Sequence, residues 1–177
     1  GNECKILDFC SNEHCVVNNT DGTNYADLTL PSEIKSFTNS ESPTSGGAIR
    51  MINIGLTADN VTFNTCSSQQ GGGAIFIYNN IISDNAFYTI KLTNLVFKGC
   101  SATFGSAVYI YSPIESCTVE VKSCIFDSNK IIPPSTSKLT GGALYITAKS
   151  ADVSDCSFKS NKGRGGALKI TVDFDIL

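Results

Sequence analysis

The sequence is poor in charged residues, and it has no apolar run long enough to cross a membrane as a helix. Charged residues make up 16% of the 177 residues, and 13 Lys and Arg nearly balance 16 Asp and Glu. A formal net charge of −3 gives no basic footprint, so we expect no nucleic-acid partner. A membrane helix needs about 20 consecutive apolar residues, so any membrane attachment is expected to be peripheral, through an anchor that these residues lack.

The chain also lacks the usual ligands of a metal site. His14 is its one histidine, and no two of its eight cysteines have the CxxC spacing of a zinc site. We therefore expect no metal and no cofactor. Eight cysteines are nevertheless many for a cytosolic domain, and they favour an oxidising compartment. Glycosylation triplets at Asn18 and Asn60 are compatible with secretion. The sequence shows no signal peptide, so it is either a mature chain or a trimmed one. Because the predicted strand at residues 170–174 ends abruptly, we expect a piece of a longer extracellular or cell-surface protein.

A two-part repeat runs along most of the chain. Its first part is a phenylalanine before a short polar turn, at Phe37, Phe63, Phe97, Phe126 and Phe158. Its second part is a small-residue turn, usually Gly-Gly-Ala, that leads into a strand, beginning at Gly46, Gly72, Gly105, Gly141 and Gly165. Successive second parts lie 26, 33, 36 and 24 residues apart. This variable spacing favours coils of two or three short strands joined by loops of different length.

Within each repeat the hydrophobic period is two, which is typical of a strand with one buried face. After Gly-Gly-Ala, aliphatic residues such as Ile75 and Ile77 alternate with larger ones such as Phe76. A single coil cannot bury its apolar face, whereas stacked coils share one core. The sequence therefore predicts an all-β, right-handed parallel β-helix of about five to six coils. An antiparallel sandwich would need hairpin turns, but the repeat places equivalent residues in register.

Residues 1–31 lack the repeat and contain Cys4, Cys10 and Cys15. The end of a coil stack must cover its core and its unpaired backbone groups. We therefore expect residues 1–31 to form a disulfide-braced N-terminal cap. The β-helix coils are then expected over residues 32–177.

Two further cysteine pairs occupy equivalent positions in adjacent repeats. Cys66 and Cys100 stand three residues after the repeat phenylalanine, where Asn129 and Asn161 stand in later repeats. Cys124 and Cys156 are expected to point inward. The Cα atoms of each pair should be about 5 Å apart, which is within disulfide range. The alternative is that these cysteines are small buried hydrophobic residues, because parallel stacked strands often hold Cβ vectors poorly for bridging. Cys117 has no obvious partner.

The alternation of Gly-Gly-Ala-(Ile/Leu/Val) with Phe-x-x-Asn resembles the repeat of the chlamydial polymorphic membrane proteins. The resemblance covers residues 34–170, with Cys66 and Cys100 in place of the Asn and Ser106 in place of a Gly. Members of that family are autotransporter passengers that act as adhesins. The resemblance therefore implies a module at the cell surface, or at the outer membrane in a bacterium, that binds a host or cell-surface protein or glycan.

Two outward positions of the strands after Gly-Gly-Ala are predicted to form a flat aromatic patch with basic ends. The candidate binding residues are Arg50, Phe76, Tyr78, Tyr109, Tyr111, Tyr145 and Lys169. Aromatic rings flanked by cations can stack on sugars or anchor a protein. Alternatively, the rings only stabilise the sheet as cross-strand pairs, or a loop such as residues 131–134 buries them. A structural alternative is a secreted spacer or filament component that self-associates through an open coil end.

Enzymes that act on polysaccharides also use this fold, and they need paired carboxylates or acidic calcium ligands. Such groups would come from acids at equivalent positions of adjacent coils. We find no such alignment for candidates such as Glu120 and Asp152. Asp127 is expected to have Lys98 and Lys159 as neighbours and to form surface ion pairs. The sequence therefore predicts a protein that is not an enzyme, with a polysaccharide-acting enzyme as the least favoured alternative.

Overall fold

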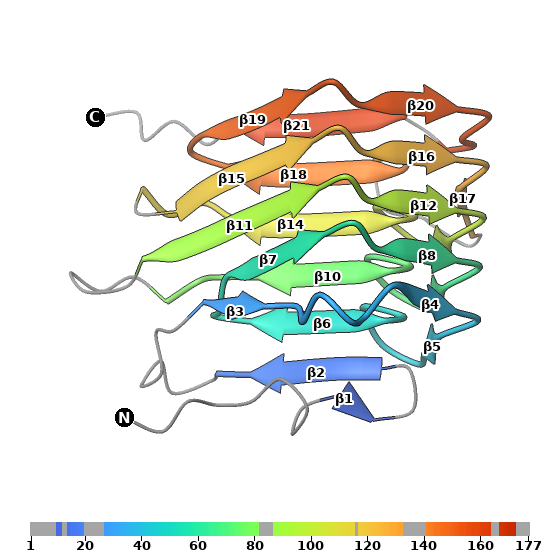
Figure 1. The fold of residues 1–177 in the computed structure, drawn as a ribbon. Helices are drawn as coiled ribbons and strands as arrows, with labels where there is room; N and C mark the ends of the chain where they lie inside the picture. Colours follow the sequence, from blue (N-terminus) through green and yellow to red (C-terminus); the bar gives the residue numbers. More distant parts are fainter. Residues whose placement is uncertain are drawn as a thin grey trace.

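The chain folds as a stack of β-coils. The computed structural model describes residues 10–11, 14–19, 27–81, 87–115, 117–132, 141–163 and 167–172. Within these ranges the regular secondary structure consists of β-strands, without a helix. The strands wind around one axis so that equivalent strands of successive turns lie side by side, from β2 near the bottom of Figure 1 to β19–β21 at its top.

Equivalent strands pair into four sheets, here called A to D. Sheet A contains β1 (Cys10–Ser11), β2 (His14–Asn18), β6 (Ile49–Ile52), β10 (Ile75–Tyr78), β14 (Val108–Ser112), β18 (Leu144–Ala148) and β21 (Leu168–Val172). Sheet B contains β3 (Leu28–Thr29), β7 (Leu56–Asp59), β11 (Tyr88–Thr93), β15 (Cys117–Lys122) and β19 (Ala151–Ser154). Sheet C contains β4 (Ser36–Thr38), β8 (Thr62–Asn64), β12 (Val96–Lys98), β16 (Ile125–Asp127) and β20 (Ser157–Lys159). Sheet D contains β5 (Glu41–Ser42), β9 (Ser67–Ser68), β13 (Ser101–Ala102) and β17 (Lys130–Ile131).

One turn takes one strand from each sheet in the order A, B, C, D. The turns that start at β2, β6, β10 and β14 are complete within the described residues, and β18, β19 and β20 begin a fifth. The expectation of five to six coils with two or three strands each is therefore corrected to about four turns with four strands. Strands of sheet D are only two residues long, which is too short to give a period-two signal in the sequence.

The stacked strands begin before residue 32. β2 pairs in parallel with β6, and β3 pairs in parallel with β7, so both are part of the coil stack. The side chains of β2 alternate, with Cys15 and Val17 buried and Val16 exposed. β1 differs because it runs antiparallel to β2. The change from antiparallel pairing at β1 to parallel pairing at β2 therefore lies within residues 1–31, which were expected to form the cap.

The repeat phenylalanines form a continuous ladder inside the stack. Neighbouring rings are nearly parallel, with centroids separated by 5.2, 5.0, 4.9 and 4.8 Å from Phe37 to Phe158. Phe63, Phe97 and Phe126 are fully buried. This confirms the register and the inward Phe ladder that the repeat predicts.

The Gly-Gly corner brings the backbones of adjacent turns into close contact. Gly72 has a φ of +64°, a conformation that favours glycine. A Cβ atom on Gly73 would lie 2.2 Å from the carbonyl oxygen of Ser106 in the next turn. The first glycine is therefore required by backbone conformation and the second by the approach of the next turn.

The corner between sheets C and D explains why either Cys or Asn stands three residues after each ladder phenylalanine from Phe63 onward. The Nδ2 atoms of Asn129 and Asn161 donate hydrogen bonds to the ladder phenylalanine carbonyls of the turn before. The thiols of Cys66 and Cys100 contact the equivalent carbonyls, of Phe37 and Phe63, with Sγ–O distances of 3.7 Å. Both residue types thus direct a donor to the equivalent backbone carbonyl, and the thiol is the weaker donor of the two.

A second polar ladder follows the strands of sheet A. Asn53 Oδ1 accepts hydrogen bonds from the backbone N–H groups of Asn80 and Ile81, at 2.9 and 3.2 Å. Asn79 Oδ1 accepts from the N–H of Ile54 at 3.0 Å, and Asn79 Nδ2 donates to Ser112 Oγ at 3.4 Å. The sequence signal was an Asn or Ser at the end of three successive aliphatic strands, at Asn53, Asn79 and Ser112, which the Phe and Gly repeats obscured.

Candidate functional site

The outer face of sheet A places the predicted binding residues in two columns. Backbone pairing sets Arg50, Phe76, Tyr109, Tyr145 and Lys169 side by side in successive turns. Two residues further along the same strands, Tyr78 pairs with Tyr111. The structure thus brings all seven predicted residues onto one face, with a cation at each end of the longer column.

The rings of these columns stack on one another. Phe76 and Tyr109 have centroids 5.1 Å apart, and Tyr109 and Tyr145 have centroids 5.0 Å apart. In the second column, Tyr78 and Tyr111 stack at 4.9 Å. Interplanar angles of 8°, 25° and 12° make these stacks close to parallel. Each ring therefore covers a face of its neighbour, and the ring edges remain for contacts outside the sheet.

Cations flank the ends of the longer column. Lys169 Nζ lies 5.1 Å from the ring centroid of Tyr145, within range of a cation–π contact. At the other end, Arg50 pairs with Phe76 in register, and its Nε atom is buried without a hydrogen-bond partner. His14 starts β2 and is half-buried, and burial lowers its pKa. His14 is therefore part of sheet A and partly shielded from solvent.

Exposure differs along the face. Phe76 and Tyr145 are only 9% and 6% exposed. Tyr78, Tyr109 and Tyr111 are half-buried, and we call these three residues the tyrosine face. Burial, followed by the neighbouring tyrosines, raises the pKa of Tyr109 to about 12. Tyr109 thus stays neutral at physiological pH and presents an uncharged hydroxyl group.

The two predicted cross-turn disulfides are wrong. Cys66, Cys100, Cys124 and Cys156 are free thiols, as is Cys117. The sulfur atoms of Cys124 and Cys156 lie 3.4 and 3.5 Å from carbonyl oxygens of the preceding turn. Those of Cys66 and Cys100 lie 3.7 Å from such oxygens. Because stacked side chains all point the same way along the axis, the sulfurs of a pair follow one another and do not converge.

The N-terminal cysteines have a different environment. Cys15 is 1% exposed and disulfide-bonded. Cys10 faces Cys15 across the antiparallel β1–β2 pair. Cys4 lies outside the described residues, so the pairing within the expected cap stays a prediction.

The buried thiols make stability depend on pH. Burial raises the pKa of Cys117 to about 11 and that of Cys124 to about 12, whereas an unfolded thiol ionises near pH 8.5. A folded pKa above the unfolded one means that the stabilisation is complete below about pH 8.5 and is lost as pH rises through the folded pKa values. We expect the urea midpoint to fall between pH 8 and pH 10.5, and to fall less for Cys117→Ala/Cys124→Ala. An equal fall in that variant would contradict the assignment to these thiols.

The two glycosylation candidates are exposed. Asn18 lies on β2 with its side chain outward, although Thr20 of its triplet is outside the described residues. Asn60 lies at the turn between sheets B and C, with a φ of +55°. Both side chains are accessible to modification, which stays a prediction.

Acidic residues align more closely than the sequence indicated. Glu120 and Asp152 are paired in register on the outer face of sheet B, so the expectation that no acids align is wrong. Lys91 lies beneath Glu120 and forms an ion pair with it at 3.4 Å. Asp127 lies between Lys98 and Lys159 in register, yet forms no ion pair with either. In the described ranges, no three His, Cys, Asp or Glu side chains are grouped to hold a metal ion.

No protein-family model matches the chain, and no curated protein or solved structure is significantly similar to it. The resemblance to the chlamydial polymorphic membrane proteins therefore rests on the repeat motifs alone. Among the residues that the structure describes, no helix has the length and apolar character needed to cross a membrane.

Proposed function

We propose that the chain is an extracellular or cell-surface adhesin-type module that binds a partner protein through the tyrosine face. The observation that carries this proposal is the group of half-buried tyrosines on the outer face of sheet A. One of them, Tyr109, lies in a column of side chains that ends in Arg50 and Lys169. Tyrosine is enriched in protein interfaces because it combines apolar area with a hydroxyl at low entropic cost. Presenting such residues on rigid strands also reduces the ordering cost of binding.

A protein fits this face better than a glycan. Stacking on a sugar requires a free ring face, but Tyr109 is stacked between Phe76 and Tyr145. Tyr78 and Tyr111 each cover one face of the other. Phe104 packs edge-on against Tyr109 with centroids 5.0 Å apart, which restricts that ring further. Ring edges and hydroxyl groups remain, and these suit apolar contacts and hydrogen bonds across a protein interface.

Three finer features belong to the same proposal. We infer that the coil is right-handed, because about 98% of parallel crossover connections are. The disulfide of Cys15 supports a braced N-terminal cap. A non-catalytic role is supported by Glu120, which an ion pair with Lys91 neutralises on an outer sheet face.

A structural spacer or filament component is the second candidate. It is favoured by the last turn, where inward-facing residues are less well covered than in earlier turns. Phe158 and Leu168 are only half-buried, and Ile170 is 41% exposed. Self-association through this end would cover them, and analytical ultracentrifugation would detect the resulting oligomers.

The tyrosine face is tested with the double variant Tyr78→Ala/Tyr111→Ala, which removes one column and leaves the other intact. On an array of purified cell-surface proteins and glycans, we expect the wild-type chain to bind protein spots. The double variant should bind about 30-fold more weakly, because central interface tyrosines typically contribute 2 kcal/mol or more. Titration by surface plasmon resonance measures the change.

The matched control is Thr89→Ala/Thr118→Ala, which removes an exposed, paired column from sheet B. This variant should bind as the wild type does. Equal affinity of the tyrosine variant and the control would remove the tyrosine face from the proposal. Binding to glycan spots alone would contradict the choice of a protein partner.

A further inference from the structure

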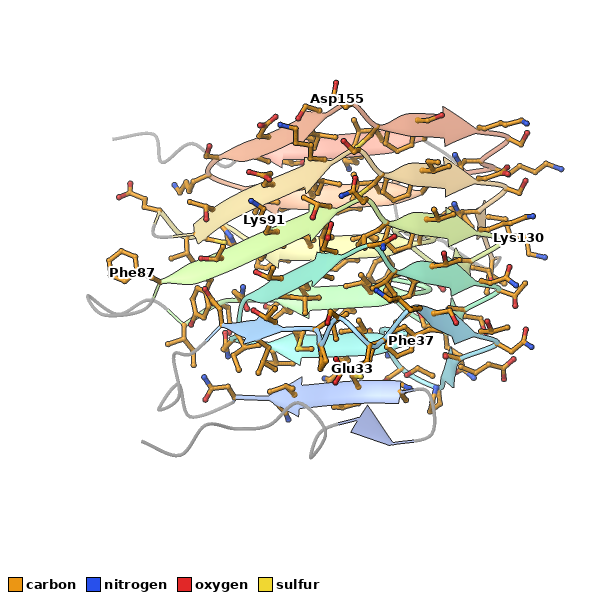
Figure 2. The ribbon with its side chains drawn as sticks, viewed as in Figure 1. Glu33, Phe37, Phe87, Lys91, Lys130 and Asp155 are labelled. Carbon is orange, nitrogen blue, oxygen red and sulfur yellow. The ribbon has the colours of Figure 1, made fainter. Side chains whose placement is uncertain are left out.

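Four lysines gather at the corner between sheets C and D in the later turns. Lys98 and Lys159 lie on sheet C, on either side of Asp127. Lys130 starts β17 on sheet D and pairs directly with Lys162 of the next turn. All four side chains are exposed, and we call them the lysine corner. Figure 2 shows Lys130 at the edge of the stack.

The four lysines of the corner outnumber the one acid that lies in register with them, Asp127, so the corner keeps a net positive charge. The ion pair between Lys91 and Glu120 lies on sheet B, and none joins a lysine of the corner to an acid that the structure describes. Asp127 is the acid nearest in register, and its Oδ1 accepts a hydrogen bond from Ser128 Oγ at 2.7 Å. Lys130 and Lys162 are directly opposite each other, an arrangement that destabilises a sheet.

Positive charge at this corner is confined to the later turns. The sheet D positions beneath Lys130 and Lys162 are Ser101, Ser67 and Glu41. The sheet C positions beneath Lys98 are Asn64 and Thr38. The chain as a whole carries a formal charge of −3. A local cationic array on an acidic protein, kept despite like-charge repulsion, indicates an anionic ligand.

We propose that the lysine corner binds a linear, sulfated polysaccharide. The array follows the stack axis with a rise of about 4.8 Å per turn, so a chain of spaced anionic groups can contact successive turns. Lysine ammonium groups are mobile point charges that suit a flexible polyanion. This site lies on other sheets than the tyrosine face and goes beyond the proposed function.

The surrounding residues argue against nucleic acid. Single-stranded nucleic acids are held by aromatic platforms on which the bases stack. Two residues before the lysine column, the outer face of sheet C carries Val96, Ile125 and Ser157, which have no rings. The cluster therefore provides charge without a stacking surface, as a sulfated polysaccharide requires.

The test is heparin binding, measured by isothermal titration calorimetry on the intact chain. The variant Lys130→Gln/Lys162→Gln should bind heparin roughly 10- to 30-fold more weakly, because each lysine near an anionic surface contributes about one factor of five. The control Lys35→Gln/Lys122→Gln makes the same change in net charge at exposed sites away from the corner. It should keep the wild-type affinity to within about twofold, and salt should weaken wild-type binding.

Equal affinity of the corner variant and the wild type would overturn the proposal, as would an equal loss in the control. Fully desulfated heparin should not bind, and its binding would overturn the role of the sulfates. Tighter binding to phosphatidylserine vesicles or to poly-dT than to heparin would overturn the choice of a polysaccharide. Because Tyr78→Ala/Tyr111→Ala leaves the lysines in place, heparin binding by that variant separates a failure of this proposal from a failure of the tyrosine face. Circular dichroism confirms that each variant is folded.

Discussion

Replacing Phe97 with alanine is expected to lower the free energy of unfolding by about 3–5 kcal/mol. Phe97 is fully buried and stacks on Phe63 at 5.0 Å and on Phe126 at 4.9 Å. Truncation removes ring contacts with two turns at once and leaves a cavity in the middle of the ladder. Urea denaturation followed by far-UV circular dichroism measures the change.

The chain provides a matched control for this truncation. Phe87 directly precedes β11 and is 66% exposed, so Phe87→Ala should change stability by less than about 0.5 kcal/mol. The loss of stability for Phe97→Leu should lie between those of Phe97→Ala and Phe87→Ala, because the leucine side chain refills part of the cavity. A loss below 1 kcal/mol for Phe97→Ala would show that the ladder is not the centre of the core.

Replacing Gly73 with alanine is expected to destabilise the chain by about 3 kcal/mol or more, because one methyl group would clash with the backbone of the next turn. The new Cβ atom would lie 2.2 Å from the Ser106 carbonyl oxygen and 2.7 Å from that of Ser101. Backbone atoms of a paired turn cannot rotate aside as a side chain can, so the two turns must separate locally. Thermal and urea denaturation measure the loss.

Gly99→Ala separates this clash from the general cost of replacing a turn glycine. Gly99 has a φ of +65°, but the nearest atom to an added Cβ is Thr65 Cγ2 at 3.5 Å. We expect a loss of about 1 kcal/mol from backbone conformation alone. If Gly73→Ala cost no more than Gly99→Ala, close contact between turns would not be the reason for the second glycine.

The register of the stack was predictable because the same residue types recur at equivalent positions. Aligning Phe63 with Phe97 and Gly72 with Gly105 fixed which residues pair in sheets A and C. Sheet D was missed because a strand of two residues has no period. The Asn53–Asn79 ladder was missed because its members are neither aromatic nor glycine.

Direction along the stack axis was the information that the sequence lacked. Alternation shows which side of a strand a side chain occupies, but not whether it leans toward the turn before or after. The thiols of Cys124 and Cys156 both approach the preceding turn, so equivalent positions did not give bonded sulfurs. The sequence likewise did not show whether the outward aromatic rings expose their faces or their edges, and the stacking of Tyr109 on Tyr145 decides this for that pair.

Charge patterns were likewise hidden by the loops of variable length. Glu120 and Asp152 are 32 residues apart, and Lys130 and Lys162 are also 32 residues apart. Each pair lies side by side in adjacent turns. A net charge summed over the chain cannot report such a local array, because the stack gathers like charges along one edge.

The corner donors give the stack a chemical direction. The Nδ2 atoms of Asn129 and Asn161 each donate a hydrogen bond to a backbone carbonyl of the turn before. Asn129 Nδ2 also donates to the side-chain Oδ1 of Asn161 in the turn after, at 2.9 Å. An engineered extra turn placed after Phe158 would bring its own corner amide to the Phe158 carbonyl, as Asn161 does to the Phe126 carbonyl. One placed ahead of the first turn would instead meet Ser40 at the corner position, where later turns have Cys or Asn. Adding a turn therefore needs different side chains at the two ends of the stack. We expect a turn added at the C-terminal end to require fewer further substitutions than one added at the N-terminal end.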